Sequence, residues 1–94
     1  MKLSSLTTTD KIKLAAELDG FTHLVEIAGR NYNVMPEQYP ATVLPDYATS
    51  YDAIIPCLTR QRLWNKVMQR FQFAAPTPAM ILDELLIETG KCER

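Results

Sequence analysis

Side chains that could carry out covalent or metal chemistry are few in this sequence and far apart. One histidine, His23, and two cysteines, Cys57 and Cys92, supply all of its imidazole and thiol groups. Nucleophilic catalysis needs a nucleophile beside a base, and a zinc site needs three or four convergent ligands. These three residues have no such spacing. The sequence therefore predicts no catalytic residues, no metal site and no cofactor, and we expect the protein not to be an enzyme.

A row of cations in the second half of the chain offers a different kind of chemistry. Arg62, Lys66 and Arg70 recur every fourth residue on the exposed side of an expected helix. Arg60 lies nearby and joins the row. Such a row can contact phosphates or an acidic protein surface. It can equally be an ordinary solvated face, because the acidic residues Asp83, Glu84 and Glu88 of the next helix could neutralise it.

Tyrosines form the second candidate surface. Four of them fall within twenty residues, in or beside a proline-rich stretch: Tyr32, Tyr39, Tyr47 and Tyr51. Tyrosine is enriched at binding hot spots because its ring buries a large area with few rotatable bonds. These four are candidate partner-binding residues. The alternative is that their rings pack on the core and leave their hydroxyls in water.

The N-terminal half predicts one helix followed by a hairpin. Thr7 or Thr8 can cap a helix whose first turn contains Asp10 and which ends at Gly20. After it, "FTHLVEI" and "NYNVM" read as two strands that turn near Ala28–Arg30. The stretch 35–48 contains three of the six prolines and predicts a loop, with a possible third strand at Thr42–Leu44.

The C-terminal half predicts further helices. Thr49 and Ser50 are capping residues for a helix that should break or kink at Pro56, between Ile54 and Thr59, because proline lacks the backbone N–H. Thr59 would then cap the next helix.

That next helix runs to Phe71, with Trp64 at the centre of its apolar stripe. The last helix is capped by Thr77, has Pro78 at its first position and closes at Gly90. Its acidic residues Asp83, Glu84 and Glu88 should face outward. Its centre, Leu85, should be buried against Trp64 or against neighbours that both share.

Composition sets the class of protein. The 94 residues are 47% hydrophobic and 22% charged, with a net charge of −1, which is typical of one globular domain. The fold class expected for residues 1–94 is a single α+β domain with a small antiparallel hairpin, or three strands, packed with three to four helices. No signal peptide or membrane span is evident, and two reduced thiols fit a cytoplasmic protein.

Three segments together carry a family resemblance. "LPDYATSYDAIIPCL" resembles the "LPxYxxSYDAIIP" signature of small bacteriophage and prophage proteins assigned to the phage ABA-sandwich domain. "DKIKLAAELDGF" is similar to that family's "RIKIAEACGW", with Phe21 where a tryptophan is usual. "TPAMILDELLIETGKCER" is similar to "TPAQLAEALLRATGKWE", with Cys92 in place of the terminal tryptophan.

The resemblance implies a phage setting and an α+β architecture, and it transfers no catalytic residues. Small accessory phage proteins most often occupy a surface of a host protein. We therefore expect a protein that binds and modulates a host protein in the bacterial cytoplasm, such as a component of bacterial immunity. The alternative is a nucleic-acid- or nucleotide-binding protein that uses the cationic row.

Overall fold

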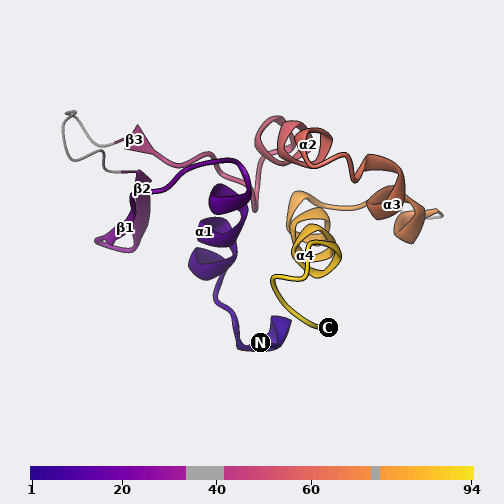
Figure 1. The fold of residues 1–94 in the computed structure, drawn as a ribbon, viewed down its shortest axis with the longest axis horizontal. Helices are drawn as coiled ribbons and strands as arrows, with labels where there is room; N and C mark the ends of the chain where they lie inside the picture. The colour runs from indigo at the N-terminus through magenta and orange to yellow at the C-terminus, as the bar shows by residue number, and fades with distance from the viewer. Residues whose placement is uncertain (34–41, 73–74) are drawn as a thin grey trace.

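The chain folds into helices grouped at one end and a small sheet at the other (Figure 1). A computed structural model describes residues 1–33, 42–72 and 75–94. These residues form an α+β fold with a three-stranded antiparallel sheet, as the sequence predicts. The elements in chain order are η1 Leu3–Ser5, α1 Thr8–Leu18, β1 Leu24–Ile27, β2 Arg30–Asn33, β3 Thr42–Val43, α2 Tyr51–Arg60, α3 Trp64–Met68, η2 Gln69–Phe71 and α4 Pro78–Glu88.

Helix α1 begins and ends where the sequence predicts. The Thr7 hydroxyl accepts a hydrogen bond from the Asp10 backbone N–H at 3.1 Å, and the Asp10 carboxylate accepts one from the Thr7 N–H at 3.2 Å. This reciprocal pair is a capping box. At the other end Gly20 has a φ of 97°, and Phe21 donates back to the Ala16 carbonyl, which closes the helix with a Schellman motif.

The predicted hairpin and the third strand are both present. Ala28 and Gly29 turn the chain with positive φ values of 52° and 80°, the backbone conformation that tight hairpins require. Strand order is β1-β2-β3, and both pairings are antiparallel. The first strand is shorter than "FTHLVEI", because β1 begins at Leu24.

The prediction of a helix break at Pro56 was wrong. Helix α2 continues through Pro56 to Arg60, and Thr59 lies inside it, where its hydroxyl donates to the Ile55 carbonyl at 3.0 Å. Pro56 lies on the exposed side of α2, so water can satisfy the backbone carbonyl that the proline leaves unpaired.

The chain turns later, at Arg62, whose φ is 58°. There Leu63 donates to the Leu58 carbonyl and Arg62 to the Thr59 carbonyl, which is a Schellman motif without glycine. Leu63 then occupies the N-cap position of α3. At the start of α2, Ser50 occupies the N-cap position, but its side chain makes no capping hydrogen bond.

Helix α4 has the predicted ends but not the predicted surroundings. Thr77 caps it through the Met80 N–H at 3.2 Å, Pro78 is its first residue and Gly90 closes it. Leu85 is fully buried as expected, but Trp64 is 46% exposed, so the prediction that Trp64 belongs to the core was wrong. From the short α3, Val67 enters the core in its place.

The core lies between α1, α2 and α4. Helix α1 lies between the sheet and the other two helices (Figure 1). The largest fully buried side chains are Tyr47, Ile54, Leu58, Val67, Ile81, Leu82, Leu85 and Leu86. No helix in the described parts of the chain has both the length and the apolar character needed to cross a lipid bilayer.

Candidate functional site

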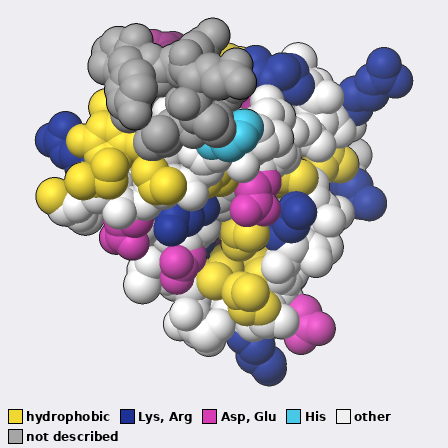
Figure 2. Space-filling view, turned by 60° about the vertical axis from the view of Figure 1, so that its left-hand side comes forward, with side chains coloured by type: hydrophobic (Ala, Val, Ile, Leu, Met, Phe, Trp, Pro, Cys, Tyr) yellow, Lys and Arg dark blue, Asp and Glu magenta, His cyan; other side chains and the backbone are white. Residues whose placement is uncertain are grey.

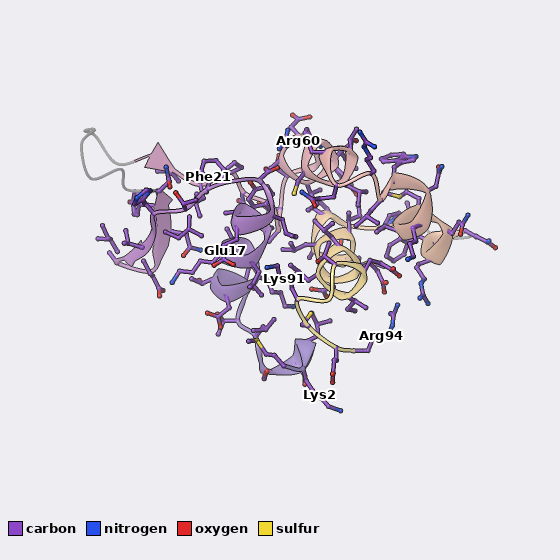
Figure 3. The ribbon with its side chains drawn as sticks, in the orientation of Figure 1. Lys2, Glu17, Phe21, Arg60, Lys91 and Arg94 are labelled. Carbon is purple, nitrogen blue, oxygen red and sulfur yellow. The ribbon has the colours of Figure 1, made fainter. Side chains whose placement is uncertain are left out.

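A cluster of titratable groups surrounds Asp19, where the end of α1 meets α2 and the segment before it. The Asp19 carboxylate is only 3% exposed. It accepts one hydrogen bond from the Tyr47 hydroxyl at 2.6 Å and two from the Arg60 guanidinium, each at 2.6 Å. Tyr47 is fully buried, whereas Arg60 reaches the cluster from the surface of α2 (Figure 3). The cluster therefore joins three segments that are distant in sequence.

The cluster contains no activated nucleophile. Burial acts to raise the pKa of Asp19, but hydrogen bonds from Arg60 and Tyr47 outweigh it and hold that pKa below its usual value. Burial, helped by the charge of Asp19, raises the pKa of the Tyr47 hydroxyl. Burial also raises the pKa of the Cys57 thiol to about 12. The thiolate is the reactive form of cysteine, and the burial of Cys57 disfavours that form near neutral pH. The arrangement is suited to holding the fold together.

Tyr47 cannot serve as a partner-binding residue in this fold. Its ring is 0% exposed and its hydroxyl is bound to Asp19, so neither is available to a second protein. The interpretation of Tyr47 as part of a recognition surface is corrected accordingly. The physical reason is that Asp19 and Arg60 provide a buried polar partner for a hydroxyl that would otherwise favour water.

Of the other candidate tyrosines, Tyr51 and Tyr32 lie within the described residues. Tyr51 is 51% exposed, and its hydroxyl donates to the Pro76 carbonyl at 2.6 Å. Tyr32 is half-buried on the sheet. Tyr39 lies outside the residues that the structure describes, as do residues 35–41 of the predicted 35–48 loop.

Acidic residues neutralise much of the cationic row. Arg60 is held by Asp19, while Lys66 and Arg70 pair with Glu88 at 3.3 Å and 3.5 Å. Arg62 forms no ion pair with another described residue, and its side chain is exposed at the turn between α2 and α3. A row with most of its charges paired is a weaker attractor for phosphates than the sequence alone indicates.

The acids of α4 are more enclosed than predicted. Glu84 is 9% exposed and accepts two hydrogen bonds from the Arg94 guanidinium, at 2.5 Å and 2.8 Å. The expectation that Glu84 faces solvent is therefore corrected, because Arg94 and Arg70 cover it. Asp83 does not meet the cationic row; it pairs with Lys11 of α1 at 2.9 Å.

The outer face of the sheet is an exposed apolar surface of which the sequence analysis singled out one member, Tyr32. Residues opposite one another in antiparallel strands share a face, which places Val25, Tyr32 and Val43 in one row. Ile27 lies beside this row, opposite Arg30. The aliphatic members are 37% (Val25), 53% (Ile27) and 54% (Val43) exposed.

The inner face of the sheet packs on α1 instead. Leu24 is half-buried there, Leu44 is 6% exposed, and the Asn31 amide donates to the Thr9 carbonyl of α1 at 3.0 Å.

Figure 2, which turns the sheet end toward the viewer, shows hydrophobic side chains gathered on the surface at that end of the molecule. We call Val25, Ile27, Tyr32 and Val43 the outer sheet face. The alternation in "FTHLVEI" places Val25 and Ile27 on the same face of the strand, but it does not predict which face of the sheet a helix will cover.

The histidine and the cysteines stay apart. His23 is exposed, and its ring Nδ1 lies 2.9 Å from the Thr22 hydroxyl. Both cysteines are buried free thiols. Within the described residues, no group of three His, Cys, Asp or Glu side chains is arranged to hold a metal ion.

Comparisons with protein-family models, with curated proteins and with solved structures found no match. The resemblance to phage ABA-sandwich proteins therefore stays a prediction that rests on the sequence motifs.

Proposed function

We propose that this protein acts by binding another protein through the outer sheet face. The observation that supports the proposal is one row of apolar side chains, Val25, Tyr32 and Val43, flanked by Ile27, which no other described element covers. A contiguous exposed apolar surface is typical of protein interaction sites, and a half-buried tyrosine is a suitable anchor for a partner.

The partner's contact surface must match this chemistry. Its centre must be apolar, since three members of the face are aliphatic and the fourth is a tyrosine. Arg30 is paired with Ile27 and is the charged residue at the end of this face. A carboxylate at the rim of the partner's surface would complement it. In the phage setting that the sequence motifs imply, the partner would be a host protein in the bacterial cytoplasm, such as an immune component.

Site-specific photocrosslinking tests the proposal with a matched control one residue away. A photoreactive phenylalanine analogue at Val25 would lie on the outer sheet face, whereas the same group at Glu26 would point to the opposite face. We expect a discrete crosslinked species in bacterial cells from position 25 and not from position 26. Equal crosslinking at both positions, or none at position 25, would contradict the proposal.

A second variant separates loss of binding from loss of folding. Val25→Ser combined with Ile27→Ser removes the exposed aliphatic groups, and exposed substitutions usually change stability by only about 0.5 kcal/mol each. We expect the double variant to melt close to the wild type and to fail to compete for the crosslinked partner. Full competition by this variant would show that the partner binds elsewhere.

The alternative is nucleic-acid binding through Arg60, Arg62, Lys66 and Arg70, and the ion pairs of this row make it the weaker candidate. A gel shift with duplex DNA at two salt concentrations distinguishes the two. We expect no shifted species. A species that weakens steeply with added salt would indicate phosphate contacts and reverse the ranking.

A further inference from the structure

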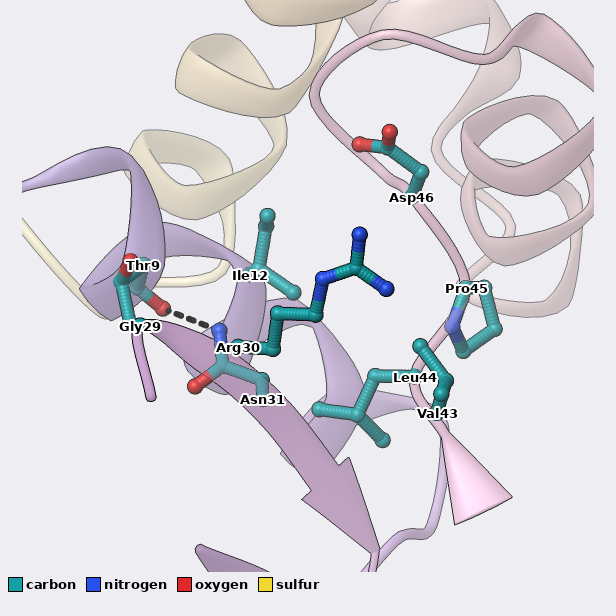
Figure 4. A pocket seen from close by; sticks show the side chains of 9 residues that line it. All are labelled: Thr9, Ile12, Gly29, Arg30, Asn31, Val43, Leu44, Pro45 and Asp46. Atoms are coloured by element: carbon teal, nitrogen blue, oxygen red, sulfur yellow. Dashed lines mark hydrogen bonds between the residues drawn. The ribbon is translucent and has the colours of Figure 1, made fainter. Parts of the chain in front are cut away.

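An open pocket of about 340 Å³ lies between α1, the start of β2 and the segment that follows β3 (Figure 4). Its volume is within the range of about 300–1,000 Å³ that is typical of small-molecule sites. Part of its wall is apolar, formed by Ile12, Val43, Leu44 and Pro45. The pocket is thus large enough for a small molecule and offers its aliphatic part a place to pack.

Two opposite charges accompany that apolar wall. The Arg30 guanidinium extends across the pocket toward the side on which Asp46 lies (Figure 4). Arg30 makes no ion pair or side-chain hydrogen bond with another described residue. Asp46 accepts a hydrogen bond from the Thr49 hydroxyl and makes no ion pair with a described residue. Both charges are therefore available to a ligand.

The same wall contains a buried polar group whose hydrogen bonding is incomplete. Asn31 is 8% exposed, and its amide nitrogen donates to the Thr9 carbonyl at 3.0 Å. Its amide oxygen is buried and accepts no hydrogen bond from the described residues. An unsatisfied buried acceptor is unfavourable, because it has lost its hydrogen bonds to water without replacing them. A donor that reached it from the pocket would remove that cost.

We propose that this pocket binds a small zwitterion of the amino-acid type with an aliphatic side chain. The planar guanidinium of Arg30 suits a carboxylate, which it can hold with two parallel hydrogen bonds. Asp46, on the neighbouring side, suits an ammonium group. In an α-amino acid the ammonium and the carboxylate are attached to the same carbon, so an arginine and an aspartate that line one pocket complement both groups. The aliphatic side chain then packs on Ile12, Leu44 and Pro45.

Leucine is the probe that tests the proposal, by titration into ¹⁵N-labelled protein followed by NMR. We expect the amide signals of Ile12 and Leu44 to shift and to saturate. Arg30→Gln and Asp46→Asn should each weaken leucine binding at least about tenfold, the equivalent of ~1.4 kcal/mol. Asn at position 46 keeps an acceptor for the Thr49 hydroxyl, so the local fold is retained.

Two analogues of leucine separate its charges. 4-Methylpentanoate lacks the ammonium group, and 3-methylbutylamine lacks the carboxylate. Each should bind more weakly than leucine. Asp46→Asn should not weaken the binding of the acid, and Arg30→Gln should not weaken that of the amine, because each change removes a like charge.

Controls distinguish this site from a general charge effect and from the outer sheet face. Arg62→Gln removes an exposed arginine outside the pocket and should leave leucine binding unchanged. The Val25→Ser/Ile27→Ser double variant should do the same, because neither residue lines the pocket, whereas Val43 and Arg30 border both surfaces.

Three results would overturn the proposal: no saturable shift with leucine, shifts confined to residues outside the pocket, or acid binding as tight as leucine binding. Acid binding as tight as leucine binding would indicate a simple anion site at Arg30.

Discussion

Replacing Tyr47 with phenylalanine removes one hydroxyl from the core and leaves the aromatic ring in place. That hydroxyl donates to the Asp19 carboxylate at 2.6 Å, and the ring is fully buried, so water cannot take over as donor. Hydrogen bonds to charged groups contribute roughly 1.5–3 kcal/mol to stability. Arg60 still pairs with Asp19 in the variant, which favours the lower part of that range. We expect Tyr47→Phe to lower the free energy of unfolding by about 1.5–2 kcal/mol.

Urea denaturation at neutral pH, followed by circular dichroism, measures this loss. Tyr51→Phe is the matched control, because its hydroxyl donates at the same 2.6 Å distance to the Pro76 carbonyl, but at an exposed site and to a neutral acceptor. The control should lose about 0.5 kcal/mol or less. Equal losses in the two variants would refute the reasoning that burial and charge set the strength of the Tyr47 bond.

The same pair of proteins has a defined pH dependence. The pKa of Asp19 is lowered in the folded state, so its stabilising contribution is fully present above the unfolded pKa of about 3.9. That contribution is lost as pH falls through the lower folded value. The stability gap between wild type and Tyr47→Phe should therefore be constant from about pH 8 to about pH 5, and it should narrow below about pH 4. A gap that widens as the carboxyl is protonated would mean that the ionised carboxylate is not the better acceptor.

Further substitutions and one labelling experiment test the helices and the core. Leu85→Ala should cost about 2–5 kcal/mol in urea denaturation, because Leu85 is fully buried; a loss below about 0.5 kcal/mol would place it outside the core. Pro56→Ala should raise the melting temperature, since it restores the N–H that can bond to the Asp52 carbonyl within α2; destabilisation would show that packing requires the proline ring. Arg62→Gly should stabilise by about 0.5–1 kcal/mol by relieving the left-handed backbone at the end of α2, and no gain would argue against that strain. Iodoacetamide near pH 8 should leave Cys57 unmodified in the folded protein and label it in urea, as mass spectrometry would show; rapid labelling without urea would contradict its burial.

Helix ends could be predicted from the sequence wherever a glycine or a capping residue marks them. Gly20 and Gly90 close α1 and α4 in the left-handed conformation that glycine adopts most easily. The end of α2 has the same Schellman geometry, but Arg62 occupies the position where glycine is usual. Pro56 provided a visible but misleading signal, because a proline on the exposed side of a helix leaves its free carbonyl in water.

Burial of individual side chains was harder to predict, because it depends on contacts between distant segments. The stripe containing Trp64 predicts one long helix, yet α3 is only five residues long, and Val67 is buried in place of the tryptophan. Glu84 is enclosed because Arg94, ten positions later, folds back over it. Helical periodicity predicts which side of one helix is apolar. It carries no information about a charged residue from another segment that packs over that helix.

The candidate binding surface shows the same limit most clearly. Tyr47 was selected because tyrosine is common at interfaces, and a core tyrosine has the same sequence signature until its hydroxyl partner is known. That partner, Asp19, lies at the end of α1, twenty-eight positions earlier. Once Tyr47 belongs to the core, the exposed apolar surface at the sheet end comes from Val25, Ile27 and Val43, which composition alone does not distinguish from core strand residues. Their exposure follows from topology, because α1 covers the inner face of the sheet and no other described element reaches the outer one. A search for the proposed partner should therefore begin at the sheet.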